Sequence, residues 1–267
     1  MTRTLRAALA AAASVALLAG CATAPTGGDA TPTPEADTRP LSELTLYPDP
    51  RAAEGPRTAV AGFETIVPVA ENPTQNLPAT VVSHDPSGDR EVTVTDTSRV
   101  LALDMAASLS ATVWGLGLGD TLVGRDMTTT FPGTEDLPLV TSGAHAINAE
   151  SVLALRPTLV ITDGSIGPRD VLQQLRDAGV TVVFIENEPS FEGAVQLARD
   201  VAAVFGVPAE GELLAERIAG QIDDIRAQIA AIAPKEHDKK LRMVFLYLRG
   251  GSGIYYLFGD ESGADHV

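Results

Sequence analysis

The sequence predicts an α/β fold of two lobes, each built on a parallel β-sheet, with one long helix between them. Between residues 91 and 206, short strand patterns alternate with helical patterns, a rhythm typical of a parallel sheet covered by helices. Residues 210–232 then carry one apolar stripe at helical spacing, and further strand patterns follow. Of the 267 residues, 45% are hydrophobic and 20% are charged, so most of the chain can bury a core.

Residues 1–20 have the pattern of a secretory signal peptide. Arg3 and Arg6 form a short basic region, residues 7–20 are apolar, and small residues directly precede Cys21. The position of Cys21 makes the segment resemble a bacterial lipoprotein signal, in which the Cys thiol takes a diacylglycerol and becomes the new N-terminus. That resemblance implies an extracytoplasmic protein anchored to the cell membrane by its lipid. An ordinary signal with a chance Cys is the alternative.

The segment that follows is predicted to be a flexible, lipid-anchored linker covering residues 21–57. Its first part is rich in Pro, Thr, Ala, Gly and acidic residues, which bury too little apolar surface to order the chain. Pro-rich sequence without clear periodicity continues to about residue 80, and we expect loops there.

Residues 58–208 are predicted to form the N-terminal lobe. Apolar or alternating runs predict strands at 91–95, 100–103, 159–161 and 181–185. Helical patterns lie between them, at 105–116, 169–178 and 191–205. Gly115, Gly179 and Gly206 end these helical patterns, as glycine does at helix C-termini.

Residues 209–233 are predicted to form the connecting helix. Its stripe consists of Leu214, Ile218, Ile222, Ile225, Ile229 and Ile232. A helix of this extent is roughly 34 Å long, and Pro234 ends it. Residues 234–267 are predicted to begin a C-terminal lobe, with strands at 241–247 and 253–258. Because two strands cannot bury a core of their own, we expect this lobe to be truncated; a complete protein with a small accessory hairpin is the alternative.

Composition excludes several classes of protein and site. The net charge of −16 argues against nucleic acid as a partner, because that binding depends on neutralising phosphates. No apolar run reaches the roughly 18 residues needed to span a bilayer. A single Cys excludes an intramolecular disulfide and a Cys-based metal site.

No catalytic constellation is present in the sequence, which favours a binding protein over an enzyme. The glycines at 115, 117 and 119 do not match a dinucleotide-binding fingerprint, and Ser252 lacks the spacing of a nucleophile elbow. The four histidines, His84, His145, His237 and His266, form no close pair of metal ligands.

A lipoprotein anchor followed by two α/β lobes and one long helix resembles the substrate-binding proteins of ABC transporters. The single connecting helix is typical of the class with the periplasmic-binding-protein fold that carries vitamin B12, ferric siderophores and haem. Residues 153–157, Leu-Ala-Leu-Arg-Pro, followed by the strand at 158–161, are similar to the N-lobe signature of that class. Within the class, the chain is most similar to the actinobacterial haem-binding lipoproteins.

Two stretches carry this narrower resemblance. In residues 141–150 the family places a His that is one axial ligand of the haem iron, and His145 matches it, although Ala144 replaces the usual Gly before it. In residues 245–250 the family places the other ligand, a Tyr, with a supporting Arg two residues later; Tyr247 and Arg249 match these positions. The resemblance therefore implies that ferric haem b binds through His145 and Tyr247.

Physical chemistry is consistent with this pair. Ferric iron favours an anionic oxygen, and Tyr is a known haem ligand. Because side chains alternate along a strand, Arg249 lies on the same face as Tyr247, where its charge can stabilise the phenolate or meet a haem propionate. With haem bound, the ligating nitrogen of His145 and oxygen of Tyr247 should lie roughly 4 Å apart. On chemistry alone, a hydrogen-bonded surface His and a packed Tyr remain open alternatives.

The resemblance also implies partners. The protein would capture haem outside the cytoplasmic membrane, take it from cell-surface haem-binding proteins, and deliver it to the permease and ATPase subunits of an ABC uptake system. Glu150 matches the exposed acid with which the N-lobe docks on the permease; a helix-start acid favoured by the helix dipole is the alternative. A ferric siderophore or cobalamin is the alternative ligand for the same architecture.

Overall fold

The computed structural model describes residues 39, 41–47, 49, 52, 65–236, 239–240, 244–249 and 254–259. The predicted signal peptide, Cys21 and most of the predicted linker lie outside these residues, as do Ser252, His237 and His266. Among the described helices, none combines the length and the apolar character needed to span a bilayer. Before residue 65, the structure describes one short 3-10 helix, η1 (Leu41–Glu43).

A three-stranded parallel sheet forms the centre of the lobe. Its strands are β3 (Val100–Leu103), β6 (Leu159–Thr162) and β7 (Thr181–Phe184), in the order β3-β6-β7. Both pairings are parallel, which confirms the α/β prediction. All four residues of β3 and of β6 are buried, as expected of strands covered on both faces.

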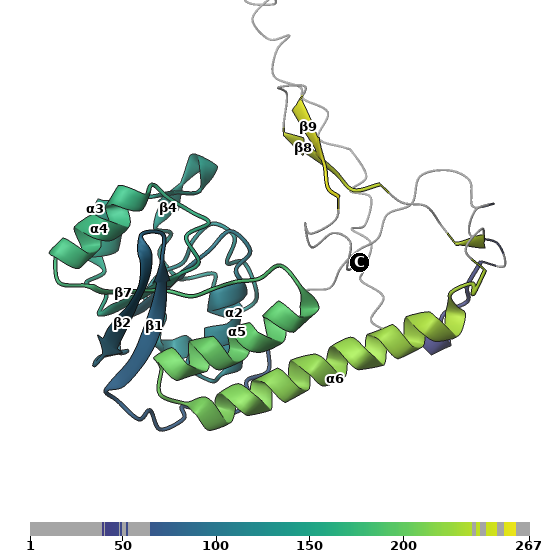
Figure 1. The fold of residues 1–267 in the computed structure, drawn as a ribbon, viewed down its shortest axis with the longest axis horizontal. Coiled ribbons are helices and arrows are strands. Elements are labelled where there is room, and N and C mark those ends of the chain that lie inside the picture. The colour runs from purple at the N-terminus through teal and green to yellow at the C-terminus, as the bar shows by residue number, and fades with distance from the viewer. Residues whose placement is uncertain are drawn as a thin grey trace, which may run out of the picture. The chain divides into compact units, whose positions relative to one another are not determined.

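The two faces of this sheet support two separate clusters of core side chains. Because side chains alternate, Leu159 and Ile161 join one cluster, with helices α2 (Ser108–Gly115) and α5 (Phe191–Val204). Val160 lies on the other face, with helices α3 (Ala149–Ala154) and α4 (Arg169–Asp177). Figure 1 shows these helices on the two sides of the sheet.

Helix α2 starts later than the sequence predicted. The helical pattern suggested a start at residue 105, but α2 begins at Ser108. Asp104, at the end of β3, accepts hydrogen bonds from the backbone N–H groups of Ala106, Ser108 and Leu109. Ala107 is in the left-handed region, at φ 59°, so the chain turns once before the helix begins.

An antiparallel hairpin precedes the sheet, and the sequence predicted only part of it. Strands β1 (Ala79–Asp85) and β2 (Gly88–Val94) pair along their full length, from Ala79 opposite Val94 to Asp85 opposite Gly88. We expected loops to about residue 80 and one strand at 91–95. The end of β1 does not show the usual alternation of apolar and polar residues, because its buried residues, Ser83 and Asp85, are themselves polar.

Asp85 is a buried carboxylate of this hairpin that pairs with two arginines, of which Arg90 is exposed. Its carboxylate lies 2.6 Å from Arg176 of α4 and 3.0 Å from Arg90 of β2, and Ser83 donates to it at 2.7 Å. Burial alone would raise the pKa of Asp85, but the hydrogen bonds from Ser83, Arg176 and Arg90 outweigh it and hold the pKa below its usual value. The pair with Arg176 therefore ties the hairpin to α4 through charges that water does not reach freely.

The predicted long helix is present as α6 (Pro208–Ile232), one residue earlier at each end than the predicted range 209–233. Its first turns pack against α5, beside which it lies in Figure 1. Gly211 allows this approach, because a Cβ there would come within 2.5 Å of the Ala202 side chain. Leu214 and Ala215 are buried, whereas Ile225, Ile229 and Ile232 are 43–50% exposed. Only the N-terminal part of the stripe is covered by described residues.

After α6, the structure describes one antiparallel hairpin. Strand β8 (Leu246–Arg249) pairs with β9 (Ile254–Leu257), and Tyr247 lies opposite Tyr256. Both predicted strands are thus present, although residues 241–243 of the first lie outside the described part.

We predict that Asp85→Asn lowers the free energy of unfolding by about 2–3 kcal/mol at pH 7, because Arg176 loses its buried charged partner. The folded-state pKa of Asp85 lies below its unfolded value. The stabilisation of the folded protein by the Asp85 carboxylate is therefore complete above about pH 4 and is lost as the pH falls through the lowered pKa. Urea unfolding at several pH values measures this difference.

Glu212→Gln is the matched control, since Glu212 pairs with Arg199 at 3.0 Å on the exposed surface. Solvent screens such a pair, and its loss should leave the unfolding midpoint nearly unchanged. Equal effects of the two substitutions would contradict a buried role for Asp85.

Candidate functional site

The carboxyl ends of the three parallel strands carry a set of polar side chains. Asp104 follows β3, Asp163 follows β6, and Asn187 lies three residues after β7. Asn187 connects two of these strand ends, because its side-chain amide donates to Asp163 at 3.1 Å and to Ser108 at 3.0 Å. In open α/β sheets, ligands bind at this edge. An open hollow of about 440 Å³ lies there, with Ser108, Asp163 and Asn187 in its lining.

Two fully buried carboxylates fix the loops at this edge. Burial raises the pKa of Asp104 above its usual value, although the hydrogen bonds from Ser108 oppose the change. Asp126 accepts from the backbone N–H of Asp104 at 3.1 Å, and also from the backbone and hydroxyl groups of Thr128 and Thr129. The exit of β3 and the loop at 126–129 are therefore one hydrogen-bonded unit.

His145 lies in a small hairpin that is attached to this edge. Strand β4 (Thr141–Ser142) pairs with β5 (Ala146–Ile147), and the 3-10 turn η4 (Gly143–His145) connects them. The backbone N–H of Ile147 donates at 2.6 Å to the carbonyl of Gly167, in the loop that leaves β6. On the other strand, the Thr141 hydroxyl accepts from the backbone N–H of Met127 at 2.9 Å. These bonds fix the hairpin between the two loops of the carboxyl edge.

The backbone of His145 is in an uncommon conformation. Its φ is 58°, in the left-handed region that costs a residue with a Cβ roughly 1–2 kcal/mol. Its Nδ1 atom is buried and has no hydrogen-bond partner among the described residues. A strained residue with an unpartnered polar atom is typical of positions kept for function rather than for stability.

Tyr247 and Arg249 both lie on β8, two positions apart. The side chain of Tyr247 is 54% exposed, and its ring centroid lies 6.1 Å from that of Tyr256 on β9. No hydrogen bond or ring contact joins Tyr247 to His145 within the described part of the chain. The two predicted ligands are thus each placed on a defined element, and their pairing stays a prediction.

Glu150 lies in the first turn of α3, as the sequence predicted, and is exposed. Asn148 caps this helix, with its side chain accepting from the backbone N–H of Ser151 at 2.9 Å. The carboxylate of Glu150 is therefore not needed as the cap and is available at the surface, five residues after His145.

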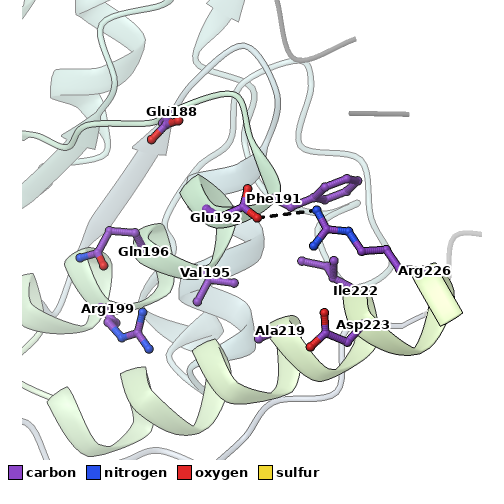
Figure 2. A pocket seen from close by; sticks show the side chains of 10 residues that line it. All are labelled: Glu188, Phe191, Glu192, Val195, Gln196, Arg199, Ala219, Ile222, Asp223 and Arg226. Atoms are coloured by element: carbon purple, nitrogen blue, oxygen red, sulfur yellow. Dashed lines mark ion pairs between the residues drawn. The ribbon is translucent and has the colours of Figure 1, made fainter. Parts of the chain in front are cut away.

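A second hollow lies between α5 and α6. It has a volume of about 520 Å³ and is lined by Phe191, Glu192, Val195, Ile222 and Arg226, among others. Figure 2 shows Arg226 reaching back to Glu192, at 3.6 Å, and its guanidinium lies 4.8 Å from the Phe191 ring centroid. None of the predicted ligand residues lines this hollow, and two of its lining charges, Glu192 and Arg226, pair with each other.

Sequence reasoning missed the residues that hold His145 in place. Met127 and Gly167 contact the His145 hairpin from separate loops, and Asp126 anchors the loop that carries Met127. The one available signal was the recurrence of polar residues directly after apolar strand runs. That pattern indicates the carboxyl edge of the sheet, but it does not predict which loops form hydrogen bonds with the His145 hairpin.

We predict that the His145→Gly protein is more stable than the His145→Ala protein by about 1 kcal/mol, because Ala keeps the Cβ that disfavours a positive φ. Urea unfolding of the two purified variants measures the difference. At Ser142, where φ is −112°, the order should reverse, since Gly has no conformational advantage there. If His145→Ala were as stable as His145→Gly, the position would not be strained.

Comparison with known proteins places the chain in a family. The family model described as "Periplasmic binding protein" matches residues 105–267. The substrate-binding lipoprotein YvrC of Bacillus subtilis, an uncharacterised ABC transporter component, is 26% identical over 188 residues, 70% of this chain and 57% of YvrC. A cobalamin-binding protein of Halobacterium salinarum is 25% identical over 198 residues, 73% of this chain and 52% of its own length.

Solved structures of the haem-binding protein HmuT are more similar in sequence, at 38–41% identity. An arginine-to-alanine variant of HmuT aligns with a TM-score of 0.77 over 85% of this chain and 68% of HmuT. The chain spans little more than half the length of the two curated relatives above. The matched family model, the parallel sheet and the long helix together show that this chain belongs to the periplasmic binding protein family.

Proposed function

We propose that this protein is the haem receptor of a bacterial ABC uptake system, which binds ferric haem b between two lobes through His145 and Tyr247. The observation that carries the proposal is the position of His145. It lies in a hairpin fixed to the carboxyl edge of the parallel sheet, in a strained backbone conformation. The similarity to HmuT, a haem-binding protein, supports haem as the ligand.

The HmuT structures support the choice of residues as well. Besides the unmodified protein, they include variants in which one His, one Tyr or one Arg is replaced by Ala, in that order along the chain. The Tyr precedes the Arg by two positions, as Tyr247 precedes Arg249 here. The three residue types and their order therefore match the three residues assigned to haem in this chain.

The chemistry of the two ligands follows from their surroundings. Because Nδ1 of His145 is buried, coordination would use Nε2, the ring nitrogen farther from the backbone. Tyr247 would bind as phenolate, which ferric iron and the nearby positive charge of Arg249 both favour over the neutral phenol. One ligand precedes α6 and the other follows it, so haem would be held between the lobes.

Charges at the sheet edge would orient the haem. Asp163, Glu186 and Glu188 follow β6 and β7, and none of them has an ion-pair partner among the described residues. Two negatively charged propionates would be repelled by this edge. The propionates would therefore point away from it, with Arg249 as the matching positive group.

Cobalamin is the second candidate ligand, because the Halobacterium relatives are cobalamin-binding proteins. A ferric siderophore, predicted above as an alternative, fits the same two-lobed fold. Neither of these ligands would need a His and a Tyr on opposite faces of an iron. Ligand binding that depends on both His145 and Tyr247 would therefore indicate haem rather than cobalamin or a siderophore.

The remaining roles complete the proposal. The protein would carry out no reaction; it would bind, hold and release its ligand. Lipid on Cys21 would anchor it to the outer face of the cell membrane, where it would receive haem from cell-surface proteins and pass it to the permease and ATPase subunits. Glu150 would dock the N-lobe on the permease, because its carboxylate is exposed and is not used as a helix cap.

We predict that the purified protein binds one ferric haem in an absorption titration, and that His145→Ala and Tyr247→Ala each weaken binding and change the spectrum differently. Losing the imidazole and losing the phenolate alter the iron in different ways. Tyr255→Ala is the matched control for Tyr247→Ala, since Tyr255 lies on the opposite face of β9 from Tyr256, the partner of Tyr247. Tight binding of cyanocobalamin with no binding of haem would replace the proposal by its alternative.

We predict that Glu150→Gln leaves haem affinity unchanged and weakens, several-fold, the stimulation of transporter ATPase activity by the haem-loaded receptor. A surface carboxylate that meets arginines on a partner acts mainly on association, so the loss should be largest at low salt. Glu212→Gln, an exposed acid on α6, is the control. Equal stimulation by both variants would remove Glu150 from the docking surface.

A further inference from the structure

Two methionines stand exposed at the carboxyl edge, and each directly follows a fully buried aspartate. Met105 comes after Asp104 and is 50% exposed; Met127 comes after Asp126 and is 41% exposed. Both aspartates are 0% exposed. The same pair of residues, a buried anchor and an exposed thioether, thus occurs twice on neighbouring loops.

Hydrogen bonds hold both methionines beside the His145 hairpin. The backbone N–H of Met105 donates at 2.9 Å to Ser165, in the loop to which the hairpin is attached through Gly167. The backbone N–H of Met127 donates at 2.9 Å to Thr141, in the hairpin itself. The two loops are joined to each other, since Asp126 accepts from Asp104 and the Thr128 hydroxyl donates at 3.0 Å to the Asp104 carbonyl.

Single exposed apolar side chains are ordinary on protein surfaces and need no explanation. These two differ because their backbone N–H groups are hydrogen-bonded to hydroxyls, directly after a buried carboxylate, while their side chains are left in solvent. Neither thioether contributes to the two core clusters of the lobe. The exposed side chains of Met105 and Met127 therefore do not stabilise either core cluster.

We propose that Met105 and Met127 form an apolar platform for one face of the porphyrin ring. The inference rests on the proposed function, because it places the macrocycle over the carboxyl edge on the side of His145. A porphyrin is a broad, flat apolar surface, and Met is a flexible, polarisable side chain that packs well against aromatic rings. The axial ligands recognise the iron, whereas the platform recognises the ring.

This division of roles makes a specific claim about the ligand. A macrocycle without iron keeps the contact with the platform and loses the two axial bonds. The platform would thus also favour a flat porphyrin over the more polar surface of a siderophore, which presents no comparable apolar face.

The test is a titration of the purified protein and its Met105→Gln/Met127→Gln double variant with ferric hemin and with metal-free protoporphyrin IX. Gln keeps the length of the side chain and removes its apolar character. We expect both porphyrins to bind about tenfold more weakly to the double variant, since two half-exposed apolar side chains lose their contact. His145→Ala should weaken hemin binding far more than metal-free porphyrin binding.

Leu213→Gln is the matched control, because Leu213 is 53% exposed on α6 and lies outside the carboxyl edge. Urea unfolding checks that every variant folds. If the double variant binds both porphyrins within twofold of the unmodified protein, the platform is overturned, and the His145 and Tyr247 variants still decide the proposed function independently. If the unmodified protein binds neither porphyrin, both proposals fail together.

Discussion

The burial of Asp104 and Asp126 is the constraint on which the candidate site depends. Together these two carboxylates set the start of α2, join the exit of β3 to the loop at 126–129, and place Met127 against Thr141. A buried carboxylate is costly unless donors surround it, and the raised pKa of Asp104 reflects that cost. The result is a rigid edge, which is what a binding site on loops requires.

That rigidity permits strain where the ligand would bind. The hydrogen bond between Ile147 and Gly167, and that between Thr141 and Met127, hold the hairpin from both sides. His145 can then keep a positive φ, and an Nδ1 without a hydrogen-bond partner among the described residues, that a free loop would relax away from. A receptor gains from such preorganisation, because less conformational freedom is lost when the ligand arrives.

Apolar runs were the parts of the fold that the sequence predicted well. The strand Leu159–Thr162 and the helix Pro208–Ile232 were found nearly to the residue, because their burial or stripe follows one simple period. The strand Ala79–Asp85 was largely missed, because its buried Asp85 pairs with Arg176, far away in the sequence. The start of α2 was placed too early, because the hydrogen bonds of Asp104 override the helical pattern. His145 was predicted by resemblance alone. The hydrogen bonds that hold its hairpin, from Ile147 to Gly167 and from Met127 to Thr141, join residues far apart in the sequence, which no local pattern predicts.

The central claim is that one iron is held by His145 on one face and by the phenolate of Tyr247 on the other. Resonance Raman spectroscopy of the ferric haem complex tests it most directly, because an iron-bound phenolate has its own vibrations. The account predicts these vibrations in the unmodified protein and in His145→Ala, and their loss in Tyr247→Phe. A complex that binds haem tightly but has no phenolate vibrations, or that keeps them in Tyr247→Phe, would contradict it.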